Sequence, residues 1–435
     1  MVKNQIDRAE HTPRATRIIE RCREIARYTE VPGQTTRTFL SPPMHAVHAL
    51  LRGWMEAAGM HVSVDAIGNL RGVYPARDGA NGPRLLIGSH LDTVPDAGAF
   101  DGVLGVVMGV ALVEELHGER LPFDLEVIGF SEEEGVRFGK PFLGSLALIG
   151  ELDKALLART DKLGLSVEDA VREFGLDPSA LADAALAEGE AFGYLELHIE
   201  QGPVLESEGR SLGVVDAIVG QTRLELTFLG QANHAGTTPM LLRHDAMAAA
   251  AAWIVATEAY ARGRNGLVAT VGRVESKPGV GNVIAGETLA TLDVRHADDA
   301  IRRQAELDLL AAAEQAATSR GVLVASRVIM EQAAVPMDGA LSEKLVEAAN
   351  RAGYRARRMG SGAGHDAMIV ARRVPAAMLF LCSPAGLSHH PDEAVLAEDV
   401  EAALATALEF MRGFGEGRHA ERSATGDQGV KDGDA

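Results

Sequence analysis

A histidine and two aspartates, His90, Asp92 and Asp101, follow closely after the apolar run at residues 85–87. The run is typical of a buried strand, and side chains at the end of such a strand reach the crevice where open α/β sheets bind ligands. Imidazole nitrogen and carboxylate oxygen together form a ligand set that suits Zn²⁺, Mn²⁺ or Co²⁺. The segment therefore predicts a metal site, with Asp92 orienting His90 through its second ring nitrogen.

Further polar segments carry residues of the same types. The acidic triplet 132–134 follows another strand-like run, His198 lies in a polar segment, and His389 and His390 form a pair. Acidic runs are more often solvated turns, and a lone histidine is more often structural than a ligand. The triplet nevertheless follows a buried strand, where adjacent carboxylates can divide two roles. One carboxylate would bind a metal while its neighbour takes a proton from water.

Composition and charge limit the class of protein. The chain has 435 residues, a length that favours two domains. A hydrophobic fraction of 46% and a charged fraction of 24% are typical of a soluble globular protein. The net charge of −19 argues against a nucleic-acid partner, because binding to phosphate requires clustered lysine and arginine. The net charge does not exclude a small acidic substrate, since one local arginine can outweigh the overall charge.

Cysteine usage and hydropathy indicate the compartment. Cys22 and Cys382 are far apart in the chain, which excludes a disulfide framework and a cysteine-based zinc site. The longest apolar run, 104–113, is too short to span a bilayer. The N-terminal segment contains Asp7 and Glu10 without an apolar core, so it predicts neither a secretory signal nor a transit peptide. We expect a cytoplasmic protein without a membrane partner.

Two patterns of predicted elements divide the chain. Up to residue 215, strand-like runs alternate with helical ones, as in an α/β sheet covered by helices. From 216 to 331 the predicted order is β-α-β-β-α-β, a four-stranded sheet with two helices on one face. The first pattern resumes at 332–414, and the polar composition of 415–435 predicts a disordered tail. The segment 216–331 is therefore predicted to be an inserted domain.

The individual elements follow from apolar periodicity and turn residues. Residues 151–190 are predicted to form short helices. The other predicted helices are 14–30, 44–59, 103–117, 244–261, 298–319 and 340–352, and the predicted strands are 62–65, 84–89, 124–130, 223–229, 267–275, 287–295, 321–330 and 376–381.

Several long motifs, taken together, resemble the amidase/hydantoinase/carbamoylase branch of the aminoacylase-like di-metal hydrolases. The similarity extends from about residue 17 to residue 412, and the motifs occur in the order found in that family. The resemblance implies a di-metal, aminopeptidase-like catalytic domain, with the inserted β-α-β-β-α-β (ferredoxin-like) domain acting as a lid or dimerisation domain. The motifs are Gly88-Ser-His-Leu-Asp-Thr93, Phe100-Asp-Gly102, Glu133-Glu-Gly-Val-Arg-Phe138, Leu197-His-Ile-Glu-Gln-Gly202, Ala232-Asn-His-Ala-Gly-Thr-Thr-Pro-Met240, Leu292-Asp-Val-Arg295, Ser361-Gly-Ala-Gly-His-Asp-Ala367 and Ser388-His389.

Carried over to these positions, the resemblance implies two divalent metal ions per subunit. Zn²⁺ and Mn²⁺ are the first expectations, with Co²⁺ as a further option, because these ligands accept all three. Asp101 would bridge the two ions, and Glu133 would be the general base. Glu132 would then be an extra acidic neighbour, and His390 is the weaker alternative to His389. The remaining metal ligands implied by the resemblance are His90, Glu134, His198 and His389.

The resemblance also implies residues that face the substrate. Arg295 would clamp a substrate carboxylate, with a surface salt bridge as the alternative role. His234 would stabilise the oxyanion, within one subunit or across a dimer interface. Asn282 would donate a hydrogen bond, although Gly279 replaces the asparagine that the family often has earlier in this loop. Weaker candidates for substrate contact are Gln201 and His365, and His365 could equally be structural.

Within this branch, the segment from Phe130 to Phe138 and the segment 161–170 are similar to the allantoate deiminases. The implied activity is hydrolysis of a ureido C–N bond in a carboxylate-bearing substrate, with allantoate giving ureidoglycine, ammonia and CO₂. An N-carbamoyl-L-amino-acid hydrolase or β-ureidopropionase is the alternative, and an aminoacylase or dipeptidase is a more distant one. A non-catalytic binding protein is disfavoured because every ligand type and the base are present. The expected partners are a small ureido acid and a second copy, paired through the lid.

Overall fold

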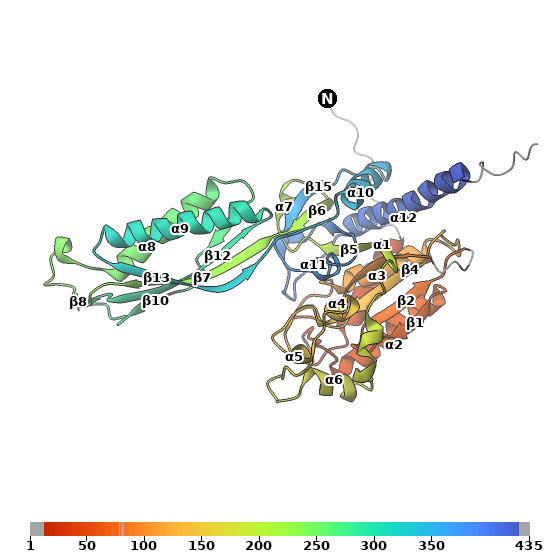
Figure 1. Ribbon diagram of the computed structural model, residues 1–435, viewed down its shortest axis with the longest axis horizontal. Helices are drawn as coiled ribbons and strands as arrows, with labels where there is room; N and C mark the ends of the chain where they lie inside the picture. Colours follow the sequence, from red (N-terminus) through yellow and green to blue (C-terminus); the bar gives the residue numbers. More distant parts are fainter. Residues whose placement is uncertain (1–12, 78, 80–81, 426–435) are drawn as a thin grey trace, which may run out of the picture. The chain divides into compact units, whose positions relative to one another are not determined.

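The computed structural model describes residues 13–77, 79 and 82–425 (Figure 1). The chain divides into two compact units. Unit 1 consists of the chain up to Asp216, Met337–Met359 and the chain from Gly364 onward, and unit 2 consists of Ala217–Pro336 and Gly360–Ala363. The predicted insertion, 216–331, begins one residue before unit 2 and ends five residues before Pro336. The short segment Gly360–Ala363 also belongs to unit 2, which the sequence did not predict.

A nine-stranded sheet of order β1-β2-β4-β3-β5-β16-β6-β14, with β15 paired to β6, contains the central strands of unit 1. Strand β3 runs parallel to β4 and β5, and β5 runs parallel to β16. The carboxyl ends of these four neighbouring strands therefore lie at one edge of the sheet. The strands are β1 (His61–Val64), β2 (Leu70–Tyr74), β3 (Arg84–His90), β4 (Leu125–Phe130), β5 (Ala191–Ile199), β6 (Leu212–Ile218), β14 (Val335–Pro336), β15 (Arg357–Ser361) and β16 (Ala376–Leu381).

Helices pack against this sheet and form the main hydrophobic core with it, chiefly α1, α2, α3, α10 and α12. A smaller core under α4 and α6 includes Phe39, Phe138 and Leu143. The helices of unit 1 are α1 (Pro13–Ala26), α2 (Pro42–Ala57), α3 (Val103–Glu114), α4 (Leu143–Leu148), α5 (Lys154–Leu157), α6 (Val167–Glu173), α7 (Val204–Ser207), α10 (Gly339–Arg351), α11 (Ala367–Val370) and α12 (Ala397–Thr425), with short 3₁₀ turns η1 (Pro178–Ala184) and η3 (Pro384–Gly386).

Helix α3 is apolar around its whole circumference because it is almost entirely buried. It packs on β3, β4 and β5, where a side chain at Gly105 would overlap the carbonyl oxygen of Leu197. Its N-cap residue, Gly102, has φ +66°, and a Cβ there would meet the His90 ring at 2.5 Å. Glycine is therefore required at the point where α3 begins, directly after Asp101.

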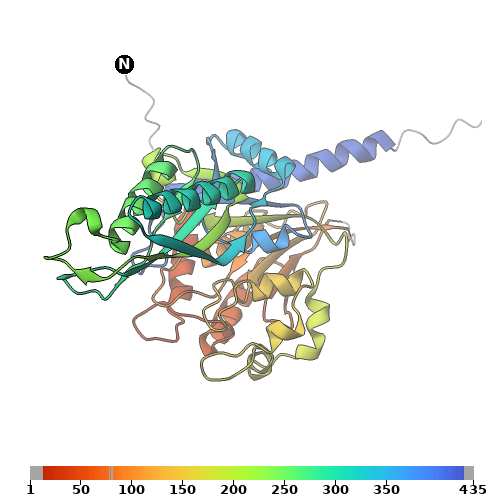
Figure 2. The same cartoon turned by 60° about the vertical axis from the view of Figure 1, so that its left-hand side comes forward.

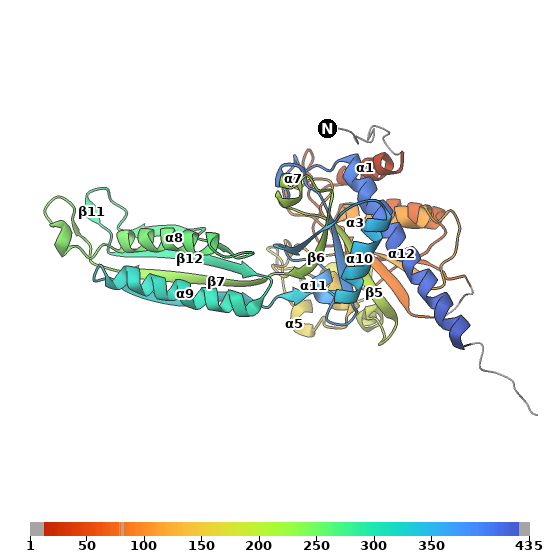
Figure 3. The same ribbon diagram turned by 90° about the horizontal axis from the view of Figure 1, so that it is seen from above.

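Unit 2 shows the predicted order of its main elements, but the predicted strand 267–275 is divided into β9 and β10, so the sheet has five strands rather than four, and β8 and β11 form a further two-stranded sheet. Its sheet has the order β10-β12-β7-β13, with β9 also paired to β12, and α8 and α9 run side by side along one face (Figures 2 and 3). Strand β12 alternates buried and partly exposed residues, because one face packs on the helices and the other does not. The elements are β7 (Gly220–Leu229), β8 (Asn233–His234), η2 (Met240–Leu242), α8 (Ala246–Arg262), β9 (Val268–Thr270), β10 (Val274–Lys277), β11 (Val283–Ile284), β12 (Glu287–His296), α9 (Asp299–Thr318) and β13 (Leu323–Gln332).

Helix α12 corrects one prediction. It continues to Thr425, so residues 415–425 are helical where a disordered tail was expected, and 426–435 lie outside the described residues. The segment holds alanine, glutamate and arginine, which are good helix formers, and adding residues to an existing helix is far easier than starting one. Among the described residues, no helix has the length and hydropathy needed to cross a membrane.

Candidate metal centre

The candidate ligands gather at the edge of the unit 1 sheet where the parallel strands end. His90 is the last residue of β3, Glu133 and Glu134 follow β4, and His198 lies near the end of β5. His389 lies in the loop after β16, and Asp101 directly precedes the first turn of α3. The structure brings the five predicted ligands and Glu133 close together, while their roles stay predictions.

Asp101 lies at the centre of the cluster, with one carboxylate oxygen facing each side. Its Oδ1 lies 3.6 Å from Nε2 of His90 and 3.2 Å from Nε2 of His198. Its Oδ2 lies 3.2 Å from Nε2 of His389, which is itself 3.4 Å from Oε1 of Glu134. Two groups of donor atoms therefore share one carboxylate, as a ligand that bridges two ions must.

The donor atoms are spaced as in a cation site, and some of them lack hydrogen-bond partners. His90, Asp101 and His198 place one donor atom each within 4.8 Å of the others, and so do Asp101, Glu134 and His389. Oδ1 of Asp101 and Nε2 of His198 are buried and have no well-directed hydrogen-bond partner among the described residues. Such atoms are costly to bury without a partner. A divalent cation would satisfy both, and imidazole and carboxylate ligands suit it chemically.

Backbone carbonyl groups orient both buried imidazoles. Nδ1 of His90 lies 2.9 Å from the carbonyl oxygen of Asp92, and Nδ1 of His198 lies 2.9 Å from that of Ile199. Because a carbonyl oxygen only accepts, each Nδ1 carries a proton, and Nε2, the nitrogen available to a metal, faces Asp101. This is the arrangement that metal-binding histidines use.

The predicted role of Asp92 needs a correction. Its carboxylate lies 3.5 Å from Nδ1 of His90, and the carbonyl group makes the hydrogen bond to the ring instead. The carboxylate accepts hydrogen bonds from the backbone N–H groups of Glu133, at 2.9 Å, and Glu134, at 3.1 Å. A carboxylate offers acceptors only, and two backbone donors point at it in the turn after β4. Asp92 therefore holds the acidic turn and the His90 segment together.

Glu133 is buried beside the ligands, with a donor atom within 4.8 Å of His90 and Glu134. Burial raises the pKa of Glu133 well above its ordinary value; the His90 charge opposes this, while the nearby Glu134 and Asp366 carboxylates add to it. A carboxylate with a raised pKa binds a proton more readily, as a general base near neutral pH must. Glu132 is also fully buried, but it belongs to none of the ligand groups found among the described residues.

Charge pairing stabilises the ionised state of Asp101. Burial raises the pKa of Asp101, but the close imidazoles of His198, His389 and His90 outweigh burial and hold that pKa well below its ordinary value. The contacts of His389 with Asp101 and with Glu134 raise the pKa of His389 to about 10. The carboxylate is therefore an anion throughout the physiological range, which is the form that binds a metal.

Gln201 and His365 lie beside the ligands. Nε2 of Gln201 donates to Oδ2 of Asp101 at 2.9 Å and to Oγ of Ser388 at 3.2 Å. The His365 ring packs on His198, with ring centroids 4.5 Å apart, and burial lowers its pKa well below the ordinary value. Their predicted contacts with substrate stay predictions, and the contacts observed are with the ligands themselves.

His234 and Asn282, both in unit 2, are brought together by a small sheet. His234 in β8 pairs with Val283 in β11, and the carbonyl oxygen of Asn282 accepts from the Ala235 N–H at 2.9 Å. Nδ1 of His234 accepts from the N–H groups of Gly236, at 3.0 Å, and Thr237, at 3.2 Å. Its proton is therefore on Nε2, and the ring is exposed with this donor available.

Arg295, also in unit 2, already makes an ion pair. Its Nε and Nη2 donate to Asp293 at 2.9 and 3.0 Å, and its Nη1 donates to the carbonyl oxygen of Gly362 at 2.7 Å. The alternative role considered from the sequence, a salt bridge, is thus present. A guanidinium group has five N–H donors, so these contacts leave two donors for a further carboxylate.

Two polar residues of the site were missed by the sequence reasoning. Ser388 Oγ donates to Oδ2 of Asp101 at 2.9 Å, and Glu393 accepts from the Asp101 backbone N–H at 2.9 Å. Both lie in the polar segment around His389, so their position in the sequence was a signal. Their contacts with Asp101 depend on loops almost three hundred residues apart, which periodicity does not predict.

The chain is similar to known proteins over most of its length. The model of Peptidase family M20/M25/M40 matches residues 86–413. The chain is 39% identical to an allantoate deiminase of Arabidopsis thaliana, covering 90% of this chain and 81% of the relative. It is 37% identical to an N-carbamoyl-L-amino acid amidohydrolase of Geobacillus stearothermophilus, covering 88% and 94%. A solved hydantoinase/carbamoylase family amidase from Burkholderia ambifaria matches with a TM-score of 0.86 at 36% identity, covering 92% and 97%.

Proposed function

The chain belongs to Peptidase family M20/M25/M40, and from this membership we propose that it is an amidohydrolase that cleaves a ureido C–N bond in a carboxylate-bearing small molecule. The observation that carries the proposal is the pair of donor groups sharing Asp101, with Glu133 buried beside them. The substrate we propose is allantoate, which would give ureidoglycine, ammonia and CO₂. Its relatives named as allantoate deiminases support this choice.

We propose that the two donor groups hold two divalent ions per chain. His90, Asp101 and His198 would hold one, and Asp101, Glu134 and His389 the other. Zn²⁺ and Mn²⁺ both fit nitrogen and oxygen ligands of this kind, and Co²⁺ is a further option. When bound, such ions polarise a carbonyl group and make water more acidic.

The side chains supply the remaining chemistry. Glu133 takes a proton from the attacking water as the new C–O bond forms, and it returns that proton to the departing nitrogen as the C–N bond breaks. Asp92 fixes the turn that carries Glu133 through two backbone hydrogen bonds. The Nε2–H of His234 donates to the oxygen on which negative charge develops, in the same subunit or in a partner subunit.

Arg295 and Asn282 are proposed to hold the substrate carboxylate. Asp293 and the Gly362 carbonyl group keep the guanidinium group of Arg295 in one orientation with donors to spare. A carboxylate bound in this way fixes the distance between the ureido carbon and Glu133, which makes attack intramolecular in effect.

Replacing Arg295 by Leu is expected to raise KM for the carboxylate substrate by roughly 10- to 100-fold, because a charge-assisted bidentate pair is lost. The value of kcat should change much less, since the reacting groups stay in place. Steady-state kinetics would check this, with Arg223→Leu as the matched control because Arg223 contacts the same Asp293 carboxylate. An unchanged KM in the Arg295 variant would remove the clamp from the proposal.

A second substrate class stays in consideration because one relative is named an N-carbamoyl-L-amino acid amidohydrolase at 37% identity. The test measures turnover by the metal-stripped protein after separate loading with Mn²⁺ and Zn²⁺, as ammonia release for the ureido compounds and as free amino-acid release for the dipeptides. The panel contains allantoate, N-carbamoyl-L-amino acids, N-carbamoyl-β-alanine and dipeptides. We expect the highest kcat/KM on allantoate. Preference for a carbamoyl compound would keep the mechanism and change the substrate, whereas activity on dipeptides alone would contradict ureido cleavage.

We also propose that two copies associate through unit 2. Strand β13 is at the edge of its sheet and exposes Leu323, Val328 and Ile329, and an exposed edge strand pairs readily with a copy of itself. The molar mass in solution tests this proposal, since a dimer has twice the 46.0 kDa of one chain.

We propose the cytoplasm as the compartment of this protein. Its two cysteines are free and buried, which fits a reducing compartment.

A further inference from the structure

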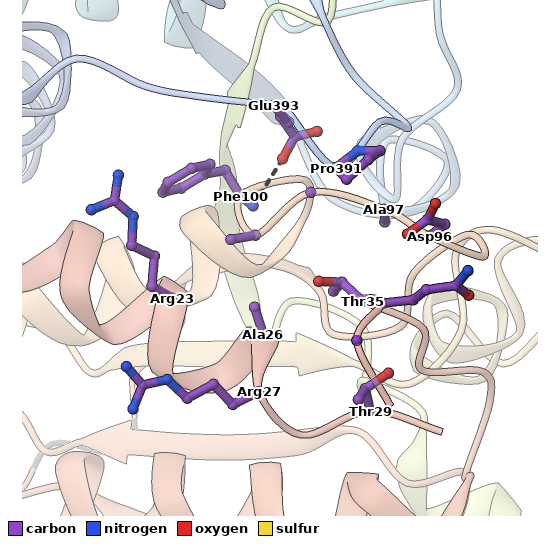
Figure 4. Close-up of a pocket in the computed structure, with 14 residues that line it drawn as sticks. Arg23, Ala26, Arg27, Thr29, Thr35, Asp96, Ala97, Phe100, Pro391 and Glu393 are labelled. Atoms are coloured by element: carbon purple, nitrogen blue, oxygen red, sulfur yellow. Dashed lines mark hydrogen bonds between the residues drawn. The ribbon is translucent and has the colours of Figure 1, made fainter. Parts of the chain in front are cut away.

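Glu393 joins two loops of unit 1 that are far apart in the sequence. Its Oε1 accepts hydrogen bonds from the backbone N–H groups of Phe100 and Asp101, each at 2.9 Å. Figure 4 shows the bond to Phe100. The residue is only 6% exposed, although it lines a pocket at the surface. The loop that carries His389 is thereby attached to the backbone of Asp101.

A second connection runs through a hydroxyl group. Oε2 of Glu393 lies 3.2 Å from Oγ of Ser388, which lies 2.9 Å from Oδ2 of Asp101. The hydroxyl group also accepts from Nε2 of Gln201 at 3.2 Å. Glu393 therefore contacts Asp101 directly at the backbone and, through Ser388, at the side chain.

The close approach of the two loops depends on a glycine. A Cβ at Gly98 would overlap the Cβ and the carboxyl group of Glu393. The Cβ of Glu393 is fixed by its own backbone, so it cannot move aside as the end of a flexible side chain would. A methyl group at Gly98 would push the loops apart and lengthen the hydrogen bonds without removing the carboxylate.

We propose that Glu393 is a positioning residue that fixes the shared carboxylate of Asp101 so that its two oxygens face the two donor groups. The inference rests on the proposed function, in which Asp101 is a ligand of both ions. Without Glu393, two buried N–H groups would lose their acceptor just before α3, and leaving such groups unpaired favours a different backbone conformation. A rotation of Asp101 would then move one oxygen away from its donor group.

The test compares Glu393→Ala with Glu393→Gln, loaded with Mn²⁺ and, separately, with Co²⁺. The alanine variant is expected to bind Mn²⁺ roughly 10- to 100-fold more weakly and to show altered visible absorption with Co²⁺, because residues that orient ligands have effects of this size. The glutamine variant should stay within about threefold of the wild type, because its amide oxygen still accepts both backbone hydrogen bonds. Gly98→Ala should resemble Glu393→Ala.

Asp161→Ala is the matched control. Oδ1 of Asp161 also accepts two backbone hydrogen bonds, from Leu163 at 2.9 Å and Leu165 at 3.1 Å, but Asp161 belongs to none of the ligand groups found in the described chain. This variant should bind Mn²⁺ as the wild type does. If Glu393→Ala does not fold, as judged by circular dichroism, Glu393→Asp replaces it, because the shorter carboxylate cannot reach both N–H groups.

The outcomes separate the inference from the proposed function. Wild-type Mn²⁺ affinity and an unchanged Co²⁺ spectrum in Glu393→Ala would overturn the positioning role, and so would a glutamine variant as impaired as the alanine variant. Neither result would affect the proposed function as long as Asp101→Asn loses its metal. Full metal content in Asp101→Asn would instead overturn the metal centre itself.

Discussion

Replacing Glu133 by Gln is expected to lower kcat by roughly 10³-fold or more, because a general base typically contributes two to four orders of magnitude. The amide has nearly the shape of the carboxylate but cannot take a proton from water. The backbone N–H of residue 133 can still donate to Asp92, so the turn after β4 should keep its conformation. The measurements are kcat on the preferred substrate and metal content by elemental analysis.

The metal content of the Glu133 variant distinguishes a base from a ligand. A donor atom of Glu133 lies within 4.8 Å of His90 and Glu134, so geometry alone permits either role. Two ions per chain with almost no turnover would support the base, whereas loss of one ion would make Glu133 a ligand. Glu132→Gln is the matched control, since it makes the same change one residue earlier, and it should stay within about tenfold of wild-type kcat, as is usual away from reacting groups. Retained turnover in the Glu133 variant would refute the assignment.

Replacing Asp101 by Asn is expected to remove both ions and to lower kcat/KM by roughly 10³-fold or more, the scale seen when a group essential to the chemistry is lost. Each carboxylate oxygen faces one donor group, and in the amide one of these oxygens becomes an NH₂ group, which cannot bind a cation. The lost negative charge weakens binding on both sides. Equilibrium dialysis against Mn²⁺, followed by elemental analysis, measures the stoichiometry.

His389→Ala is the comparison for the Asp101 variant. His389 belongs to the group with Glu134, and His90 and His198 belong to the other. Loss of His389 should therefore reduce binding from two ions to one, whereas loss of Asp101 should affect both. One ion retained in both variants would contradict a shared carboxylate, because it would mean that Asp101 serves only one group.

Much of the fold follows from local patterns. The predicted helix at 298–319 and the observed α9, Asp299–Thr318, agree because Asp298 caps the first turn and the apolar positions repeat at helical spacing. The predicted strand at 376–381 is β16 as observed, since six consecutive buried apolar residues are typical of a central parallel strand. The inserted domain was recognisable because its order of strands and helices differs from that of the flanking chain.

Other elements were missed for physical reasons. Strand β5 contains Glu196 and His198 among apolar residues, and such interior polar residues disguise a buried strand. They are tolerated because Ser89, Tyr194 and the Ala367 N–H donate to the Glu196 carboxylate. Tyr194 lies in the same strand, but Ser89 and Ala367 come from distant parts of the chain, and their arrangement is decided only when the sheet forms.

The sequence by itself determined the types of the candidate metal-site residues and, for His90, the acidic triplet 132–134 and His389, their placement at or after strand ends. The segments at 84–89, 124–130 and 376–381 predict strands from hydropathy alone. The polar residues after them must then lie at one edge if the strands are parallel. Side-chain chemistry alone leads us to expect a metal site made of imidazole and carboxylate groups. The resemblance of the motifs to a known family added which residue is the proposed base and which are the proposed ligands.

Only the tertiary structure decided how those residues are oriented. In the structure, the two oxygens of Asp101 face different donor groups. The His90 ring makes its hydrogen bond with the carbonyl group of Asp92 and not with the Asp92 carboxylate. The structure also brought Glu393 to the backbone of Asp101 from 292 positions away. Hydropathy and spacing report which face of an element is buried. Which donor meets which acceptor depends on distances between loops, and those are fixed by the packing of the whole unit.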